Sequence, residues 1–144
     1  MENPILDAPE IPSGKIYTIR SIWWATFLGS PLAGAYLLSK NNEVLDQKNN
    51  VLVIWGVAVA LIVLGIGVSF TGFMTSFLPA FLPIVGMNTF AQAQQKTEIE
   101  RFISLKGQTQ SVWTAVGISL FFFAGWLIVL IAIGYFVFGQ MPLG

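Results

Sequence analysis

Long apolar runs alternate with short polar segments along this chain of 144 residues. Residues 51–70 and 111–138 contain no charged side chain, and as helices both runs are long enough to cross a bilayer core of about 30 Å. Residues 77–95 form a less apolar run that we expect to continue as a helix to residue 106. The pattern predicts an all-α membrane protein, a small bundle with three transmembrane helices from these runs.

The first apolar run, residues 16–39, is interrupted at its centre by Gly29, Ser30 and Pro31. Proline lacks the N–H that a helix interior needs, whereas a serine followed by proline is typical of a helix start. We therefore expect two half-helices that meet at a break. The segment is either a kinked fourth span or a re-entrant hairpin. The start of its second half-helix is a candidate anion site.

A polar face is predicted on the third run. Asn88, Gln92 and Gln95 are spaced i, i+4 and i+7, so they share one side of the helix. Such a face either hydrogen-bonds to neighbouring helices or lines a small pore or substrate path. Trp126, near the middle of the last run, has an indole N–H that needs an acceptor, so we expect it to face protein rather than lipid.

Residues 96–107 combine charged side chains with an apolar stripe of Ile99, Phe102 and Ile103. This pattern predicts a cytoplasmic amphipathic helix that lies on the membrane surface or docks on a partner. At the other end of the chain, residues 1–15 carry three prolines and no periodicity. We expect them to be an extended N-terminal extension, ahead of a single helical membrane domain formed by residues 16–144.

The composition narrows the possible chemistry. The chain is 55% hydrophobic and 10% charged, whereas soluble domains carry about 25% charged residues. This composition is typical of a membrane protein. It has no Cys and no His, so disulfides, iron–sulfur clusters and the usual metal and haem ligands are excluded. The acidic residues all lie outside the apolar runs, which disfavours a proton relay. We expect no catalytic residue, no metal and no cofactor, and the zero net charge gives no sign of nucleic-acid binding.

Positive charges orient the chain, because Lys and Arg in short loops favour the cytoplasm. If the first run spans the membrane, five of the seven positive charges lie on the side of loops 40–50 and 95–110; if it re-enters, all seven do. Both arrangements place these loops in the cytoplasm and the C-terminus in the periplasm. The charge distribution favours re-entry.

The residues around the helix break, ATFLGSPLAGAYLLSKNN, begin at Ala25 and include Asn41. They resemble a motif of small, uncharacterised bacterial integral membrane proteins, roughly ATFLG-PLAG-YLL followed by asparagine. The order of apolar runs is also similar over much of the chain. The resemblance implies a location in the bacterial inner membrane and implies no activity.

These features favour a non-catalytic accessory or structural subunit of a larger bacterial membrane complex. Its partners would be membrane lipids and other membrane subunits or further copies of itself. Pairs of small residues that allow close helix packing lie at positions 29/33, 30/34, 56/60 and 65/69. The alternative is a small oligomeric channel or carrier that uses the helix break at Ser30 and Pro31 and the polar face of Asn88, Gln92 and Gln95.

Overall fold

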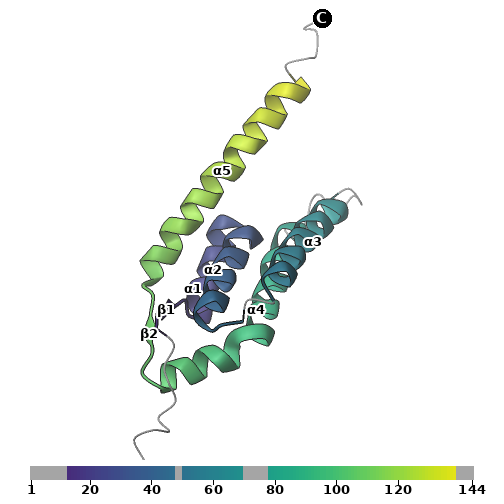
Figure 1. Cartoon of the computed structure of the whole chain (residues 1–144). Coiled ribbons are helices and arrows are strands. Elements are labelled where there is room, and N and C mark those ends of the chain that lie inside the picture. Colours follow the sequence, from purple (N-terminus) through teal and green to yellow (C-terminus); the bar gives the residue numbers. More distant parts are fainter. Residues whose placement is uncertain (1–12, 48–49, 70–77, 139–144) are drawn as a thin grey trace, which may run out of the picture.

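The computed structural model describes residues 13–47, 50–69 and 78–138 (Figure 1). Its elements are β1 (Lys15–Ile16), α1 (Ile19–Gly29), α2 (Pro31–Val44), α3 (Val51–Ser69), α4 (Leu78–Ser104), β2 (Gln108–Thr109) and α5 (Val112–Phe138). Helices make up 84% of the described residues. The prediction of a mostly helical chain is therefore confirmed.

The first apolar run forms a helical hairpin. α1 ends where the Ser30 N–H donates to the Thr26 carbonyl (3.1 Å), and α2 begins with Pro31. Ser30 itself has φ 85° and ψ 168°, a region used almost only by glycine, and this conformation reverses the chain. As a result Tyr17, ahead of α1, lies beside Asn41 in the last turn of α2, with a backbone-to-side-chain hydrogen bond of 2.7 Å.

The hairpin lies at the centre of the molecule. Figure 1 shows α5 on one side of it and α3 and α4 on the other, and α1 packs against α5 and α4 while α2 packs against α3 and α4. Gly29 faces the backbone of Ser119 on α5, and Gly34 faces Thr26 across the hairpin. Small residues at these crossings let the helices approach closely.

A two-residue parallel strand pair joins the base of the hairpin to the segment before α5. Lys15 pairs with Gln108 and Ile16 with Thr109, and the Gln110 N–H donates to the Ile16 carbonyl (2.7 Å). This pair is not predictable from the sequence, because two residues are too few to show an alternating pattern. The pair holds the beginning of the hairpin and the start of α5 at the same end of the molecule.

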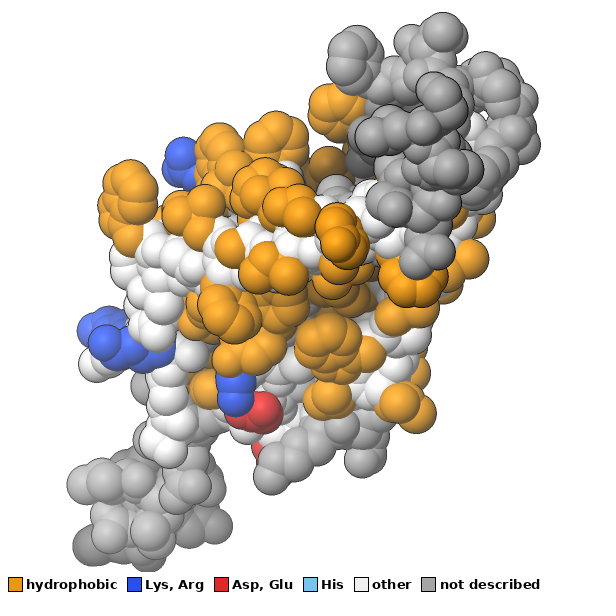
Figure 2. All heavy atoms as spheres, turned by 90° about the horizontal axis from the view of Figure 1, so that it is seen from above, with side chains coloured by type: hydrophobic (Ala, Val, Ile, Leu, Met, Phe, Trp, Pro, Cys, Tyr) orange, Lys and Arg blue, Asp and Glu red, His pale blue; other side chains and the backbone are white. Residues whose placement is uncertain are grey.

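Two helices among the described residues, α3 and α5, are long and apolar enough to cross a membrane. Most of their surface faces outward, since only 17% of the apolar window of α3 and 6% of that of α5 are buried. α4 is long enough but less apolar; its helix continues through Pro83, and its last turns run across the base of the hairpin (Figure 1). Hydrophobic side chains cover most of the face shown in Figure 2, with Lys and Arg at its border.

Candidate functional site

The base of the hairpin contains a buried network of amide side chains. Asn41 accepts from the Tyr17 N–H (2.7 Å), and its own amide group donates to the Tyr17 carbonyl (2.8 Å). The same amide group donates to Oε1 of Gln95 on α4 (3.1 Å). Asn41 therefore joins the entry of α1, the end of α2 and the middle of α4.

Gln95 completes this network. Its Nε2 donates to the Leu38 carbonyl (3.0 Å) and to Oδ1 of Asn42, and all three amide side chains are buried. Buried amides that are fully hydrogen-bonded fix one arrangement of the surrounding helices. None of these groups titrates or acts as a nucleophile, so we assign the network a structural role.

The predicted polar face is not a single surface in the structure. Gln95 lies in the buried network, Gln92 is exposed, and Asn88 is partly buried with an Oδ1 that has no hydrogen-bond partner among the described residues. The interpretation as hydrogen bonding between helices therefore applies to Gln95. The interpretation as a pore lining stays a prediction.

The predicted apolar stripe of Ile99, Phe102 and Ile103 is mostly buried within the chain. Ile99 and Phe102 belong to the core of the chain, and the Phe102 ring covers Gly107 so closely that any side chain there would overlap it. Only Ile103, with 43% of its surface exposed, remains available to lipid or to a partner. This part of the helix is amphipathic as predicted, but other residues of the same chain cover most of its apolar stripe.

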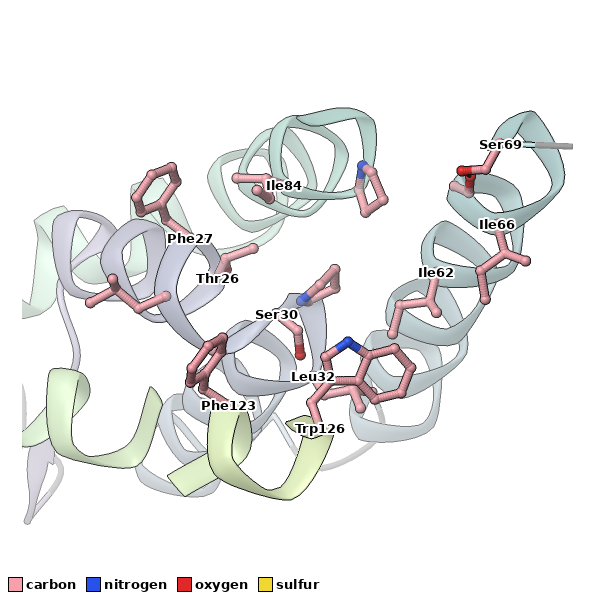
Figure 3. A pocket seen from close by; sticks show the side chains of 15 residues that line it. Thr26, Phe27, Ser30, Leu32, Ile62, Ile66, Ser69, Ile84, Phe123 and Trp126 are labelled. Atoms are coloured by element: carbon pink, nitrogen blue, oxygen red, sulfur yellow. Dashed lines mark hydrogen bonds between the residues drawn. The ribbon is translucent and has the colours of Figure 1, made fainter. Parts of the chain in front are cut away.

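A cavity of about 610 Å³ lies at the tip of the hairpin, where Gly29, Ser30 and Pro31 form part of its wall. Side chains from α3, α4 and α5 close the other sides, among them Ile62, Ile84 and Trp126 (Figure 3). No charged residue is among the described residues that line the cavity. The helix break predicted from the sequence is thus part of an apolar cavity between the helices.

The candidate anion site at this break is not favoured by the geometry. Pro31 has no N–H, and the N–H groups of Ala33 and Gly34 both donate to the Ser30 carbonyl (3.1 and 3.4 Å). Most of the donors that would hold an anion at the start of α2 are therefore unavailable. Because the described part of the cavity wall contains no Lys or Arg, the cavity suits an uncharged occupant.

Four residues bring polar side-chain atoms to the cavity wall: Thr26, Ser30, Ser69 and Trp126. The hydroxyls of Thr26 and Ser69 donate to carbonyls of their own helices, those of Ile22 and Gly65 (both 2.9 Å). Within the described part of the chain, the Ser30 hydroxyl and the Trp126 indole N–H make no hydrogen bond.

Trp126, which we expect to face protein rather than lipid, is 40% exposed, and its ring borders the cavity between the helices. Its indole N–H has no acceptor among the described residues. Sequence reasoning identified Trp126 but missed the roles of Asn41 and Asn42, which it placed in a polar loop. The asparagine that ends the recognised motif was the available signal, since a polar residue directly after an apolar helix can turn back into the bundle.

The chain thus defines a class: a mostly helical protein with two helices able to cross a membrane, built around a central helical hairpin. No protein-family model, curated protein sequence or solved structure matches it.

Proposed function

We propose that the protein is a non-catalytic accessory subunit of a larger assembly in the bacterial inner membrane. One observation carries this proposal: from Phe123 to Val129 on α5, every residue is exposed. Seven consecutive residues cover all sides of a helix. Phe123 and Trp126 border the cavity, and the other five residues leave an exposed outer surface on this part of α5. Helices in membranes associate by close packing, and this outer surface of α5 is available to a neighbour.

The small-residue pairs support the same proposal. Gly29 and Gly34 are used inside the chain, and Gly65 and Ser69 border the cavity. The remaining pair, Gly56 and Ala60, is exposed on α3, and a side chain added at Gly56 would meet nothing within 4 Å. This face of α3 can therefore accept the close approach of a helix from another subunit.

The placement in the membrane that we propose is a re-entrant hairpin with α3, α4 and α5 crossing the bilayer. α1 has 11 residues and α2 has 14, so as helices they rise about 16 Å and 21 Å and neither crosses a core of about 30 Å. The base of the hairpin lies beside β1 and β2, where Lys15 and Lys106 are exposed. The positive-inside rule places this end in the cytoplasm.

Cysteine labelling tests this placement, because the chain contains no cysteine of its own. Single-cysteine variants Ser13→Cys and Gln108→Cys should both react with a membrane-impermeant maleimide only from the cytoplasmic side, since β1 and β2 are paired. Met141→Cys, in the C-terminal tail, should react only from the periplasm. Labelling of Ser13→Cys and Gln108→Cys from opposite sides of the membrane would contradict re-entry.

Purification at native expression level in a mild detergent tests the assembly. We expect a stoichiometric membrane protein to co-migrate and to be lost in Gly56→Leu, because leucine blocks close approach at this exposed position. Leu52→Ile, on the same helix and highly exposed, is the matched control and should retain the partner. A single species of 15.8 kDa protein, with no partner by mass spectrometry before or after crosslinking, would refute the proposal.

A further inference from the structure

The cavity at the hairpin tip has the size of a small-molecule site. Its volume of about 610 Å³ lies within the range of about 300–1,000 Å³ that is typical of ligand pockets. The cavity therefore suits a small apolar molecule.

Two hydrogen-bond donors face this space without an acceptor among the described residues. Figure 3 shows the Ser30 hydroxyl and the Trp126 indole nitrogen turned toward the same part of the cavity, one from the α1–α2 turn and the other from α5. Neither side chain bonds to any residue in the described ranges. Donors in an apolar space are stabilised by an acceptor, which a ligand in the cavity can supply.

The depth of the cavity limits which molecule can bring that acceptor. If the base of the hairpin lies at the headgroup boundary, α1 of 11 residues places Ser30 about 16 Å deeper, near the middle of a core of about 30 Å. The ester carbonyls of phospholipids lie at the boundary, far above this level. An acceptor at this depth must belong to a molecule that is dissolved in the hydrocarbon core.

We propose that the cavity binds a quinone with an apolar side chain. A quinone ring is uncharged and planar and carries carbonyl oxygens, so one carbonyl accepts hydrogen bonds from the Ser30 hydroxyl and the Trp126 indole. The apolar wall, which includes Leu32, Ile62 and Phe123, surrounds the ring and the start of its side chain. The inference rests on the membrane placement proposed above and does not require a partner subunit.

The backbone conformation at Ser30 allows a substitution that removes the hydroxyl without destabilising the fold. Its φ of 85° favours glycine, so Ser30→Gly should relieve strain and leave the protein at least as stable while it removes the hydroxyl. Ser30→Ala removes the hydroxyl and keeps the strain, and Trp126→Phe keeps an aromatic ring and removes the N–H. Ser104→Ala and Trp113→Phe, both at exposed positions outside the cavity, are the matched controls.

The experiment uses the purified full chain in phosphatidylcholine vesicles, a photoreactive decylquinone as the probe, and mass spectrometry to locate the label. We expect labelling of peptides that contain Leu32, Ile62 or Phe123, and displacement by decylbenzoquinone but only weak displacement by decylbenzene. The apparent Kd for decylbenzoquinone should rise roughly threefold to tenfold in each of Ser30→Gly, Ser30→Ala and Trp126→Phe. It should stay unchanged in both controls, and Ile62→Trp, which fills the cavity, should abolish labelling.

Several results would overturn the proposal. Equal displacement by decylbenzene would show an apolar slot with no role for the carbonyl. A photoreactive phosphatidylcholine that labels the cavity and resists decylbenzoquinone would show a lipid site, and label spread over the outer faces of α3 and α5 would show no site. An unchanged Kd in Ser30→Gly, with the stability of the protein retained, would show that the Ser30 hydroxyl does not bind the quinone. The maleimide labelling and the co-purification report independently on membrane placement and on the partner.

Discussion

Replacing Asn41 by alanine is expected to lower the free energy of unfolding by about 3–5 kcal/mol. The substitution leaves three buried groups without their partner: the N–H and the carbonyl of Tyr17, and Oε1 of Gln95. An unpaired buried polar group costs about 1–3 kcal/mol, so the loss exceeds that of one average hydrogen bond between membrane helices. Equilibrium unfolding of the detergent-solubilised protein measures it.

Two matched variants show whether this cost arises from the network. Gln92→Ala removes an exposed amide from the same helix as Gln95 and should change the free energy of unfolding by less than about 0.5 kcal/mol. Asn42→Ala removes one acceptor while Nε2 of Gln95 still donates to the Leu38 carbonyl, so a cost of about 1 kcal/mol is expected. If Asn41→Ala were as mild as Gln92→Ala, the network would not stabilise the fold.

Gly29→Ala is expected to lower the free energy of unfolding by about 2 kcal/mol, and Gly29→Val by more. A Cβ at Gly29 would lie 2.7 Å from both Cα and the carbonyl oxygen of Ser119 on α5. These are backbone atoms, which no rotamer change can move away. α1 and α5 must therefore separate, and the contact between hairpin and α5 weakens along its length. Thermal unfolding in detergent, compared with the parent chain, measures the effect.

The exposed glycines of α5 provide the controls for this substitution. Gly117 and Gly125 have nothing within 4 Å of an added Cβ. Alanine there should leave the stability unchanged or raise it by up to about 1 kcal/mol, because alanine favours the helix. Equal tolerance of alanine at Gly29 and at Gly117 would mean that α1 and α5 do not meet as closely as described.

Much of the helical framework could be predicted from the sequence, because its signals are local. Uncharged runs at 51–70 and 111–138 correspond to α3 and α5, whose bounds are Val51–Ser69 and Val112–Phe138. The break at Ser30 could also be predicted, since serine followed by proline ends one helix and begins another. Whether the chain kinks or reverses there could not, because this depends on the φ of Ser30 and on contacts made far along the chain.

The candidate sites were less predictable for the same physical reason. The spacing puts Gln92 and Gln95 on the same face of the helix. In the structure Gln95 hydrogen-bonds to Asn41 and to the Leu38 carbonyl of α2, whereas Gln92 is exposed. An apolar stripe shows which side of a helix avoids water, but Ile99 and Phe102 find their cover within the chain itself. The cavity at Ser30 is formed by segments of α3, α4 and α5 that are distant in sequence.

The contact between Gly29 and Ser119 also constrains the biosynthesis of the protein. The hairpin is synthesised before α5, yet the surface that covers α1 lies on α5, and the partner strand of β1 comes only just before that helix. The hairpin is therefore incompletely covered until α5 has been translated. The contact between α1 and α5 cannot form before α5 has been made, so a chain that is truncated before α5 has a hairpin whose α5-facing side is bare.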